Sequence, residues 1–336
     1  MADDNDAVVQ EAEAAGETLE KVKAEIAKAV YGQDRVIELA LSAILAGGHA
    51  LLIGAPGLAK TRLVEAMGTA LGINSQRIQF TPDLMPSDIL GSEVLDEGST
   101  GERSFRFIKG PIFTQLLMAD EINRASPRTQ SALLQAMQEK TVTVAGQDRA
   151  LGHPFHVLAT QNPIEQEGTY PLPEAQLDRF LVQIDVAYPD RETERDILLA
   201  TTGDTDAQAA SVFTTAELLA AQTLLRQMPV GESVVELILD LVRAFRPDGP
   251  DASPQVRDTV AWGPGPRAAQ ALMLTVRARA LLQGRLAPSA EDVIDMARPV
   301  LLHRMALNFA ARARGDSLSA LIDTTAASLI GKKAAA

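Results

Sequence analysis

Eight residues from Gly54 to Thr61, with the sequence GAPGLAKT, are the first in the chain whose types and spacing suggest chemistry. They nearly match the phosphate-binding pattern G-x-x-x-x-G-K-[ST], in which backbone N–H groups cradle phosphates, the lysine reaches them and the hydroxyl contacts Mg²⁺. Ala59 stands where the pattern has its second glycine. Because Ala59 directly precedes the expected helix, we predict that it has a negative φ, which alanine adopts without strain, and that the loop works. A positive φ at Ala59 would count against this interpretation. The nucleotide-binding positions assigned to the loop are Gly54, Ala55, Gly57, Leu58, Ala59, Lys60, Thr61 and Arg62.

Two adjacent carboxylates, Asp120 and Glu121, end the apolar stretch QLLMADE. In a parallel sheet, ligands bind at the edge where the strands have their carboxyl ends. Asp120 would complete a Mg²⁺ shell together with the Thr61 hydroxyl, and Glu121 would orient and polarise an attacking water. Without the loop upstream, such a pair would more often be a capping group and a surface charge.

Three further side chains are candidates for the same chemistry. Asn162 ends the apolar stretch HVLATQN, where its amide could hold the attacking water, although an asparagine before proline also favours a turn. Arg179 follows the proline-started helix in PEAQLDRF, and Arg267 falls in the first turn of the helix in GPGPRAAQAL. Taken singly, arginines on helices are usually solvated or paired.

The elements that must position these residues alternate between strand and helix. The stretches ALLIG, FTQLLMADE, FHVLATQN and RFLVQIDV predict strands, and TRLVEAMGTALG and SPRTQSALLQAMQE predict helices between them. This alternation predicts a parallel sheet with helices on both faces. Two inserts read as hairpins, one turning around residues 98–101 and one near Gly146-Gln147.

The character of the chain changes near residue 190, after which the patterns are helical. We therefore expect an acidic, disordered leader at 1–16, an α/β nucleotide-binding core at 17–189, a helical lid at 190–330 and a disordered tail at 331–336.

Composition excludes several classes of function. The 31 basic and 44 acidic residues give a net charge of −13, which disfavours non-specific binding to nucleic acid, because phosphate neutralisation needs clustered Lys and Arg. The chain has no cysteine, which rules out disulfides, thiolate metal sites and a cysteine nucleophile. No apolar run approaches the ~18 residues of a membrane span. The acidic start shows no secretory signal, and the cytoplasm is the expected compartment.

The stretches GAPGLAKT, LLMADEINRA, LATQNP, LPEAQLDRF and GPGPRAAQAL, in this order, resemble the MoxR family of AAA+ ATPases over roughly residues 17–325. The resemblance implies a P-loop AAA+ core, with a parallel sheet flanked by helices, followed by an all-α lid. It also implies a homo-oligomeric ring, a hexamer, with ATP and Mg²⁺ bound between neighbouring subunits.

The resemblance further implies a role for each candidate residue. Those that would act in their own subunit are Lys60, Thr61, Asp120, Glu121 and Asn162, with Arg267 as a lid residue touching the same nucleotide. Arg179 would reach the γ-phosphate of a neighbour. Tyr31 and Gln33 would flank the adenine, and Arg124 and Glu174 are candidate interface residues.

Family members serve as chaperones that mature or activate protein complexes, often metalloenzymes, together with a partner that carries a von Willebrand A domain. The two hairpins would then contact the client, although ordinary surface hairpins would look the same in sequence. Three alternatives stay open: a magnesium-chelatase-like motor subunit, a DNA-remodelling motor, which the acidity disfavours, and a nucleotide-gated scaffold that does not hydrolyse ATP.

Overall fold

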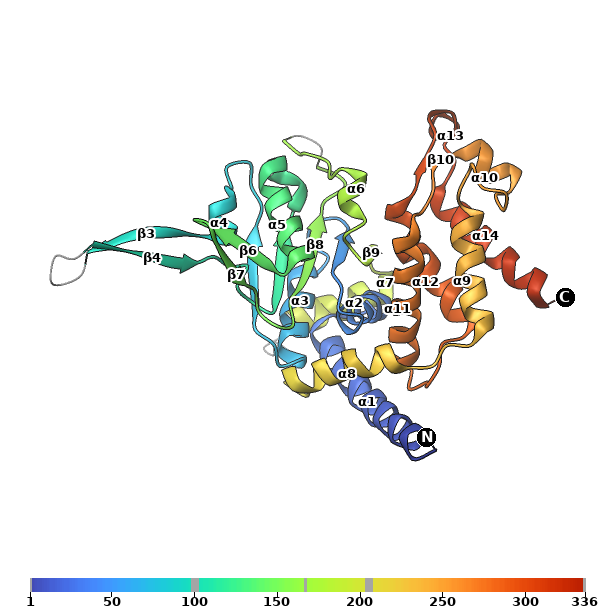
Figure 1. The fold of residues 1–336 in the computed structure, drawn as a ribbon, viewed down its shortest axis with the longest axis horizontal. Helices are drawn as coiled ribbons and strands as arrows, with labels where there is room; N and C mark the ends of the chain where they lie inside the picture. The colour runs from blue at the N-terminus through green and yellow to red at the C-terminus, as the bar shows by residue number, and fades with distance from the viewer. Residues whose placement is uncertain (1, 98–102, 166–167, 203–207, 335–336) are drawn as a thin grey trace.

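The computed structural model describes residues 2–97, 103–165, 168–202 and 208–334. It consists of an α/β core, a helical lid packed beside it, and a long hairpin that projects from the core on the side opposite the lid (Figure 1). The two parts follow the α/β core and all-α lid expected from the sequence.

A five-stranded sheet forms the centre of the core, in the order β2-β5-β8-β1-β9. All four strand pairings are parallel. The strands are β1 (Ala50–Ile53), β2 (Ser75–Gln79), β5 (Leu116–Asp120), β8 (His156–Gln161) and β9 (Val182–Asp185). The strand β2 was not predicted, because it is a polar edge strand in which only Ile78 is buried.

Alternate residues along the central strands face two separate hydrophobic cores, because successive side chains of a strand point to opposite faces. Leu52, Met118 and Leu158 belong to the core that is shared with the lid helices. Leu51 and Leu117 belong to a smaller core on the other face, shared with the helix that carries Leu133. Both faces are covered, which explains the nearly continuous apolar runs of these strands.

The helices of the core are α1 (Ala2–Ala29), α2 (Asp34–Leu45), α3 (Lys60–Ala70), α4 (Pro86–Leu90), η1 (Ile122–Arg124), α5 (Pro127–Glu139) and α6 (Glu174–Leu177). The next helix, α7 (Arg191–Thr201), lies within the range expected for the lid. The helix predicted from SPRTQSALLQAMQE is confirmed as α5: Pro127 is its first residue, and the Ser126 side chain accepts a hydrogen bond from the Thr129 N–H. Such a cap satisfies one of the free N–H groups at the start of a helix.

The lid contains α8 (Thr215–Gln227), α9 (Glu232–Ala244), α10 (Pro254–Thr259), α11 (Pro266–Leu282), α12 (Ala290–Leu301), η2 (Leu302–Arg304), α13 (Phe309–Arg314) and α14 (Leu318–Ala334). Two short strands of the lid, β10 (Val260–Trp262) and β11 (Ala306–Leu307), form an antiparallel pair. In the part of the chain that the structure describes, no helix has the length and apolar character needed to cross a membrane.

The first helix differs from the expected disordered leader. α1 runs from Ala2 to Ala29, and Ala12 within it is only 3% exposed. A Cβ at Gly16 would lie 3.0 Å from the Cα of Gly284, so the helix passes very close to the end of α11. Residues 10–16 therefore pack against the lid instead of extending into solvent. At the other end, α14 continues to Ala334, within the residues expected as a tail.

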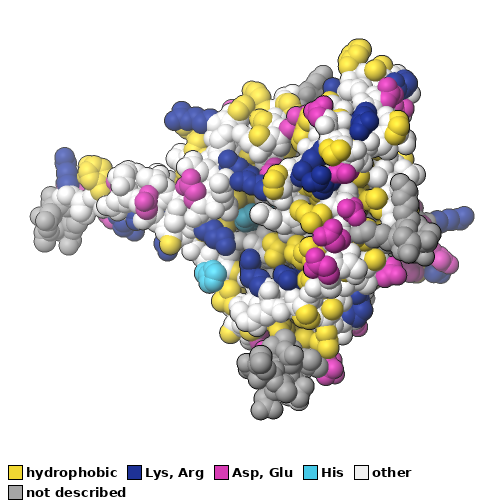
Figure 2. Space-filling view, turned by 45° about the vertical axis from the view of Figure 1, so that its right-hand side comes forward, with side chains coloured by type: hydrophobic (Ala, Val, Ile, Leu, Met, Phe, Trp, Pro, Cys, Tyr) yellow, Lys and Arg dark blue, Asp and Glu magenta, His cyan; other side chains and the backbone are white. Residues whose placement is uncertain are grey.

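Both predicted hairpins are present in the described residues. β3 (Gly91–Glu97) pairs with β4 (Arg103–Lys109), and β6 (Thr141–Val144) pairs with β7 (Gln147–Ala150). The turn expected at residues 98–101 lies outside the described residues, whereas the other turn passes through Gly146. Figure 2 shows the β3–β4 hairpin as a narrow arm with hydrophobic side chains exposed near its described end. Leu95 and Phe105, paired across this arm, are 55% and 73% exposed.

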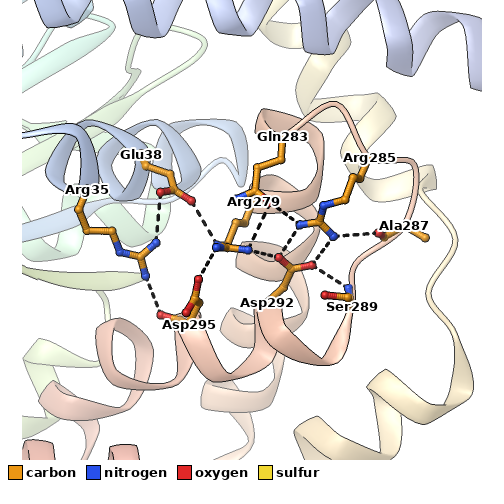
Figure 3. Close-up of polar contacts among 9 residues, drawn as sticks. All are labelled: Arg35, Glu38, Arg279, Gln283, Arg285, Ala287, Ser289, Asp292 and Asp295. Atoms are coloured by element: carbon orange, nitrogen blue, oxygen red, sulfur yellow. Dashed lines mark hydrogen bonds and ion pairs between the residues drawn. The ribbon is translucent and has the colours of Figure 1, made fainter.

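A network of charged side chains joins the core to the lid (Figure 3). Arg279 of α11 lies at its centre, with ion pairs to Glu38 of α2 and to Asp292 and Asp295 of α12. Arg35 of α2 donates a hydrogen bond to the carbonyl of Asp295 at 2.7 Å. The first turn of α2 is thus held to two lid helices at once.

Candidate functional site

The loop between β1 and α3 is closed by its own lysine. Lys60 Nζ donates hydrogen bonds to the carbonyl oxygens of Gly54 at 2.6 Å and Ala55 at 3.0 Å. Gly57 has a φ of +83°, and a Cβ there would meet nothing within 4 Å. The loop is therefore open on this side, where a phosphate group could approach its backbone.

Ala59 contradicts the prediction of a negative φ. It is the N-cap of α3, with φ 53° and ψ 19°, in the left-handed region. The carbonyl of Ala59 accepts the first hydrogen bond of the helix, from Leu63 N–H at 2.9 Å, so the chain must turn sharply here to enter α3. A left-handed conformation costs an L-residue about 1–2 kcal/mol, which explains why the general pattern has glycine at this position. The prediction that alanine fits here without strain is wrong, and the positive φ counts against the interpretation that the loop works. In its favour, Lys60 still donates to the carbonyl oxygens of Gly54 and Ala55.

Lys60 lies close to the two predicted acids. Burial lowers the pKa of its ammonium, and the charges of Asp120 and Glu121 oppose that effect by raising it. Such an effect requires proximity, so the structure brings together the lysine of one motif and the carboxylates of the other.

Asp120, at the end of β5, is buried and hydrogen-bonded through both carboxylate oxygens. Its Oδ1 accepts from Thr160 Oγ1 at 2.6 Å. Its Oδ2 accepts from Arg77 Nη2 at 2.6 Å and from Arg77 Nε at 3.2 Å. These bonds fix the carboxylate at the edge of the sheet.

Glu121 has a φ of 55°, which turns its side chain back over the same edge. Its backbone N–H donates to Thr160 Oγ1 at 2.8 Å. Its Oε2 accepts from Gln79 Nε2 at 2.8 Å and from Arg124 Nη1 at 3.1 Å. The carboxylate is held in place by two neighbouring side chains.

Sequence reasoning missed Arg77, Gln79 and Thr160 as members of this site. Arg77 and Gln79 lie on the unpredicted strand β2, two residues apart and therefore on one face of it, and Gln79 is in register with Asp120. Thr160 lies on β8, two residues before Asn162. The stretch SQRIQ has a single apolar residue, Ile78, so no alternation of apolar and polar residues marks it as a strand in the sequence.

Asn162 directly follows β8, at the edge where β5 ends. Its Oδ1 accepts from the Ile164 N–H at 3.1 Å, and its Nδ2 lies 3.5 Å from Glu165 Oε2. The turn-forming role that was left open is therefore present. The position at the sheet edge is the one that the predicted role requires.

Gln33 connects the segment before α2 to the loop. Its Nε2 donates to the carbonyl of Leu58 at 3.2 Å. Tyr31 lies half-buried two residues earlier, and Gly32 between them has a φ of 64°. A Cβ at Gly32 would come within 2.2 Å of Thr193, so this turn fits closely against α7. Arg62 is half-buried in the first turn of α3.

Arg179 and Arg267 form a second group. Arg179 follows α6, and its guanidinium makes no hydrogen bond or ion pair within the described ranges. Arg267 lies in the first turn of α11 as predicted, and Arg267 Nη1 lies 3.4 Å from Asp178 Oδ2. The structure therefore places Arg267 beside the residue that precedes Arg179. No described contact joins Arg267 to the loop, although the sequence comparison implied a nucleotide contact within its own subunit.

The residues at the loop fit a nucleotide with Mg²⁺. Across the described residues, no cluster of three or more His, Cys, Asp or Glu side chains could hold a metal alone. Mg²⁺ in nucleotide sites typically uses one or two carboxylates together with phosphate oxygens and waters. Asp120 supplies a carboxylate, Thr61 a hydroxyl at the start of α3, and the open side of the loop leaves room for phosphates.

Comparisons with known proteins agree with this site. Residues 49–182 match the model of the ATPase family associated with various cellular activities (AAA), and residues 254–324 match the AAA lid domain. The chain is 42% identical to Chaperone MoxR1 of Mycobacterium tuberculosis, over 88% of this chain and 78% of that protein. It is 33% identical to Protein MoxR of Paracoccus denitrificans, over 89% and 92%. A solved structure from Cytophaga hutchinsonii, described as a candidate ATPase, aligns with a TM-score of 0.88 and 36% identity, covering 96% of this chain and 97% of that one. With the loop, the acid pair at the end of β5 and the lid in place, this chain belongs to the MoxR family of AAA+ ATPases.

Proposed function

We propose that this protein hydrolyses ATP in a Mg²⁺-dependent manner. The observation that carries the proposal is the position of Lys60. It donates to the carbonyl oxygens of Gly54 and Ala55, and it lies near enough to Asp120 and Glu121 for their charges to oppose the lowering of its pKa by burial. An ammonium beside two carboxylates at an open, glycine-containing loop suits a phosphate ligand that arrives with its own cation.

Each residue at the loop has a defined task in this proposal. The backbone N–H groups of the loop and Lys60 bind the β- and γ-phosphates. Thr61 and Asp120 would hold Mg²⁺, which neutralises charge that develops on the phosphate oxygens. Gln33, which donates to the carbonyl of Leu58, and Tyr31, two residues earlier, would flank the base.

Glu121 and Asn162 act on water. The Glu121 carboxylate accepts from Gln79 and Arg124, and these bonds orient it at the sheet edge. From there it orients and polarises the attacking water, while the Asn162 amide holds the same water toward the γ-phosphate. Asp120, held by Thr160 and Arg77, would present its carboxylate to the metal.

The site needs a second subunit. The guanidinium of Arg179 makes no hydrogen bond or ion pair within the described residues, so we propose that it reaches the nucleotide of a neighbour. An arginine supplied in this way stabilises charge in the transition state and is worth about 10³-fold or more in related phosphoryl transfers. A closed ring, a hexamer, supplies such an arginine to every site.

We further propose that the ring is a chaperone for a protein complex, such as a metalloenzyme, and acts with a partner that carries a von Willebrand A domain. The similarity to Chaperone MoxR1 of Mycobacterium tuberculosis supports the chaperone role. The β3–β4 arm, with Leu95 and Phe105 exposed, is a suitable contact for a client. A magnesium-chelatase-like motor subunit and a non-hydrolysing scaffold are the alternatives.

The test is the rate of ATP hydrolysis as a function of protein concentration, with oligomer size followed in parallel. We expect the rate per subunit to rise with assembly. Glu121→Gln should bind ATP and stall, and Arg179→Ala should assemble without turnover. If the wild-type protein binds no nucleotide at any concentration, the loop is decayed at Ala59. If the wild-type protein binds ATP and assembles but never hydrolyses ATP, the alternative of a non-hydrolysing scaffold is correct.

A further inference from the structure

We propose that Asp178 is a positioning residue for Arg179, and that the lid sets the position of this arginine through Arg304. The inference rests on the proposed function. It adds that the surface offered to a neighbouring subunit is built jointly by the core and the lid of one chain.

Arg304 forms hydrogen bonds to the turn that carries Arg179. Its side chain is only 4% exposed, and its Nε donates to Asp178 Oδ1 at 2.8 Å. Its Nη2 donates to the carbonyl of Phe180 at 2.7 Å, and its Nη1 to the carbonyl of Leu181 at 3.1 Å. The residues on both sides of Arg179 are therefore fixed by one buried guanidinium that comes from η2 of the lid.

The residue before Arg304 also bonds to this turn. His303 Nε2 donates to the carbonyl of Phe180 at 2.9 Å. Burial lowers the pKa of Arg304, and the hydrogen bond and charge of Asp178 oppose that effect. A buried guanidinium that loses its carboxylate becomes costly, so Asp178 is required for Arg304 to remain in this position.

Arg267 is the second, looser partner of the same carboxylate. Its side chain is 57% exposed and lies 3.4 Å from Asp178 Oδ2, on the oxygen that Arg304 leaves free. Exposed pairs of this kind contribute little stability, so an approaching anion can take Arg267 while Arg304 keeps its bond. Asp178 thus holds two arginines from the lid next to a third, Arg179, which has no partner within the described part of the chain.

The two lid arginines and Asp178 border one cavity. Arg267, Arg304 and Asp178 line a hollow of about 520 Å³, together with Glu174 of α6 and Trp262 of β10. Trp262 is the one tryptophan of the chain. Its fluorescence therefore reports on this cluster without a label.

The experiment uses mixed oligomers, which separate two tasks of each subunit. A Glu121→Gln subunit cannot hydrolyse ATP but can offer Arg179, and an Arg179→Ala subunit can hydrolyse ATP only beside a neighbour that offers it. We expect hydrolysis to recover when the two are mixed. Recovery should fall by about 10- to 100-fold when the Glu121→Gln subunit also carries Asp178→Asn, because a small displacement of a reacting group has an effect of this size.

The reciprocal mixture distinguishes positioning from general damage. Asp178→Asn subunits mixed with Glu121→Gln subunits should hydrolyse ATP normally, since their own loop is intact and the neighbour offers Arg179. Asp251→Asn is the matched control, because Asp251 also accepts from an arginine, Arg243 at 2.7 Å, but lies within the lid. It should leave both mixtures unchanged. Trp262 fluorescence should change with Asp178→Asn and not with Asp251→Asn.

Equal loss in both Asp178→Asn mixtures would overturn the inference in favour of a purely structural role. Full recovery in both would overturn it as well, while leaving the proposed function intact. If wild-type subunits never hydrolyse ATP, the proposed function fails and the inference fails with it. Should Asp178→Asn not assemble, Asp178→Glu keeps the charge and moves it by one methylene. A Glu121→Gln/Asp178→Glu subunit that offers Arg179 as well as the parent does would also refute the inference.

Discussion

At the scale of single residues, two left-handed conformations frame the site. Ala59 and Glu121 both have a φ near +55°, the first at the start of α3 and the second at the end of β5. Backbone strain of this kind persists where the surrounding structure demands it, and it is concentrated at functional sites. At Glu121 the chain leaves β5, and at Ala59 it turns to enter α3.

The strain at Ala59 predicts a stabilising substitution. Ala59→Gly removes the left-handed penalty of about 1–2 kcal/mol from the folded state. Glycine also makes the unfolded chain more flexible, which destabilises the folded state by about half that amount. We expect a net stabilisation of about 0.5–1 kcal/mol, measured by thermal or urea unfolding. ATP binding should be kept.

The control makes the same chemical change in a regular helix. Ala220→Gly, at an exposed position inside α8, should destabilise by up to about 1 kcal/mol. Equal destabilisation by both substitutions would show that Ala59 is not strained.

At the scale of elements, the charged network of Figure 3 holds the start of α2 against α11 and α12. Asp292 is fully buried within it and accepts hydrogen bonds from Arg279, from Arg285 and from the Ser289 N–H. Burial raises the pKa of Asp292, but these hydrogen bonds outweigh it and leave the pKa below its usual value. Gln33, directly before α2, bonds to the loop at Leu58. The same helix therefore contacts both the lid and the candidate nucleotide site.

Removing the buried acid should be costly. Asp292→Ala leaves two arginines without their buried partner, and we expect a loss of about 3 kcal/mol or more in the free energy of unfolding. Asp295→Ala is the matched control, because its side chain is 45% exposed, and it should cost less than about 1 kcal/mol. Similar losses from both would mean that burial does not decide the strength of this network.

At the scale of the whole molecule, three of the four histidines are buried and act as neutral hydrogen-bonding groups. His49 accepts from the Val157 N–H and lies 3.2 Å from the carbonyl of Met137. Burial lowers the pKa of His49 to about 3 and that of His156 to about 4, and it lowers the pKa of His303 well below its usual value. These side chains lie between strands, helices and the lid, so protonating them disturbs several contacts at once.

These histidines predict that the free energy of unfolding decreases as the pH is lowered. In the unfolded chain these histidines become protonated near pH 6.5. In the folded chain they become protonated only at the lower pH values that match their lowered pKa values. The contribution is therefore fully present above about pH 6.5 and is lost as the pH falls, by up to about 1.4 kcal/mol per pH unit for each histidine. The measurement is urea unfolding at pH 7.5, 6.5 and 5.5.

Exposed His153 supplies the control. His153→Gln should leave the pH dependence as it is, whereas His49→Gln should reduce it. A free energy of unfolding that stays constant from pH 7.5 to 5.5 would contradict the prediction.

The sequence by itself determined the local features of this protein. The spacing in GAPGLAKT, the acids that end β5, the asparagine after β8 and the Ser126 cap all depend on neighbours a few residues away, and short-range patterns report such neighbours well. The alternation of these strands with helices was enough to predict a parallel sheet with its ligand edge.

The tertiary structure alone decided the rest, because those features depend on residues far apart in the chain. The strand β2 has no apolar pattern and exists only through its pairing with β5, so the contacts of Arg77 and Gln79 with the two acids could not be foreseen. The conformation of Ala59 follows from closing the loop, and the order in residues 10–16 from a surface on α11. Asp178 meets Arg267 and Arg304 across 89 and 126 residues of sequence. No local propensity encodes a contact of that range, and it is set only when the lid packs on the core.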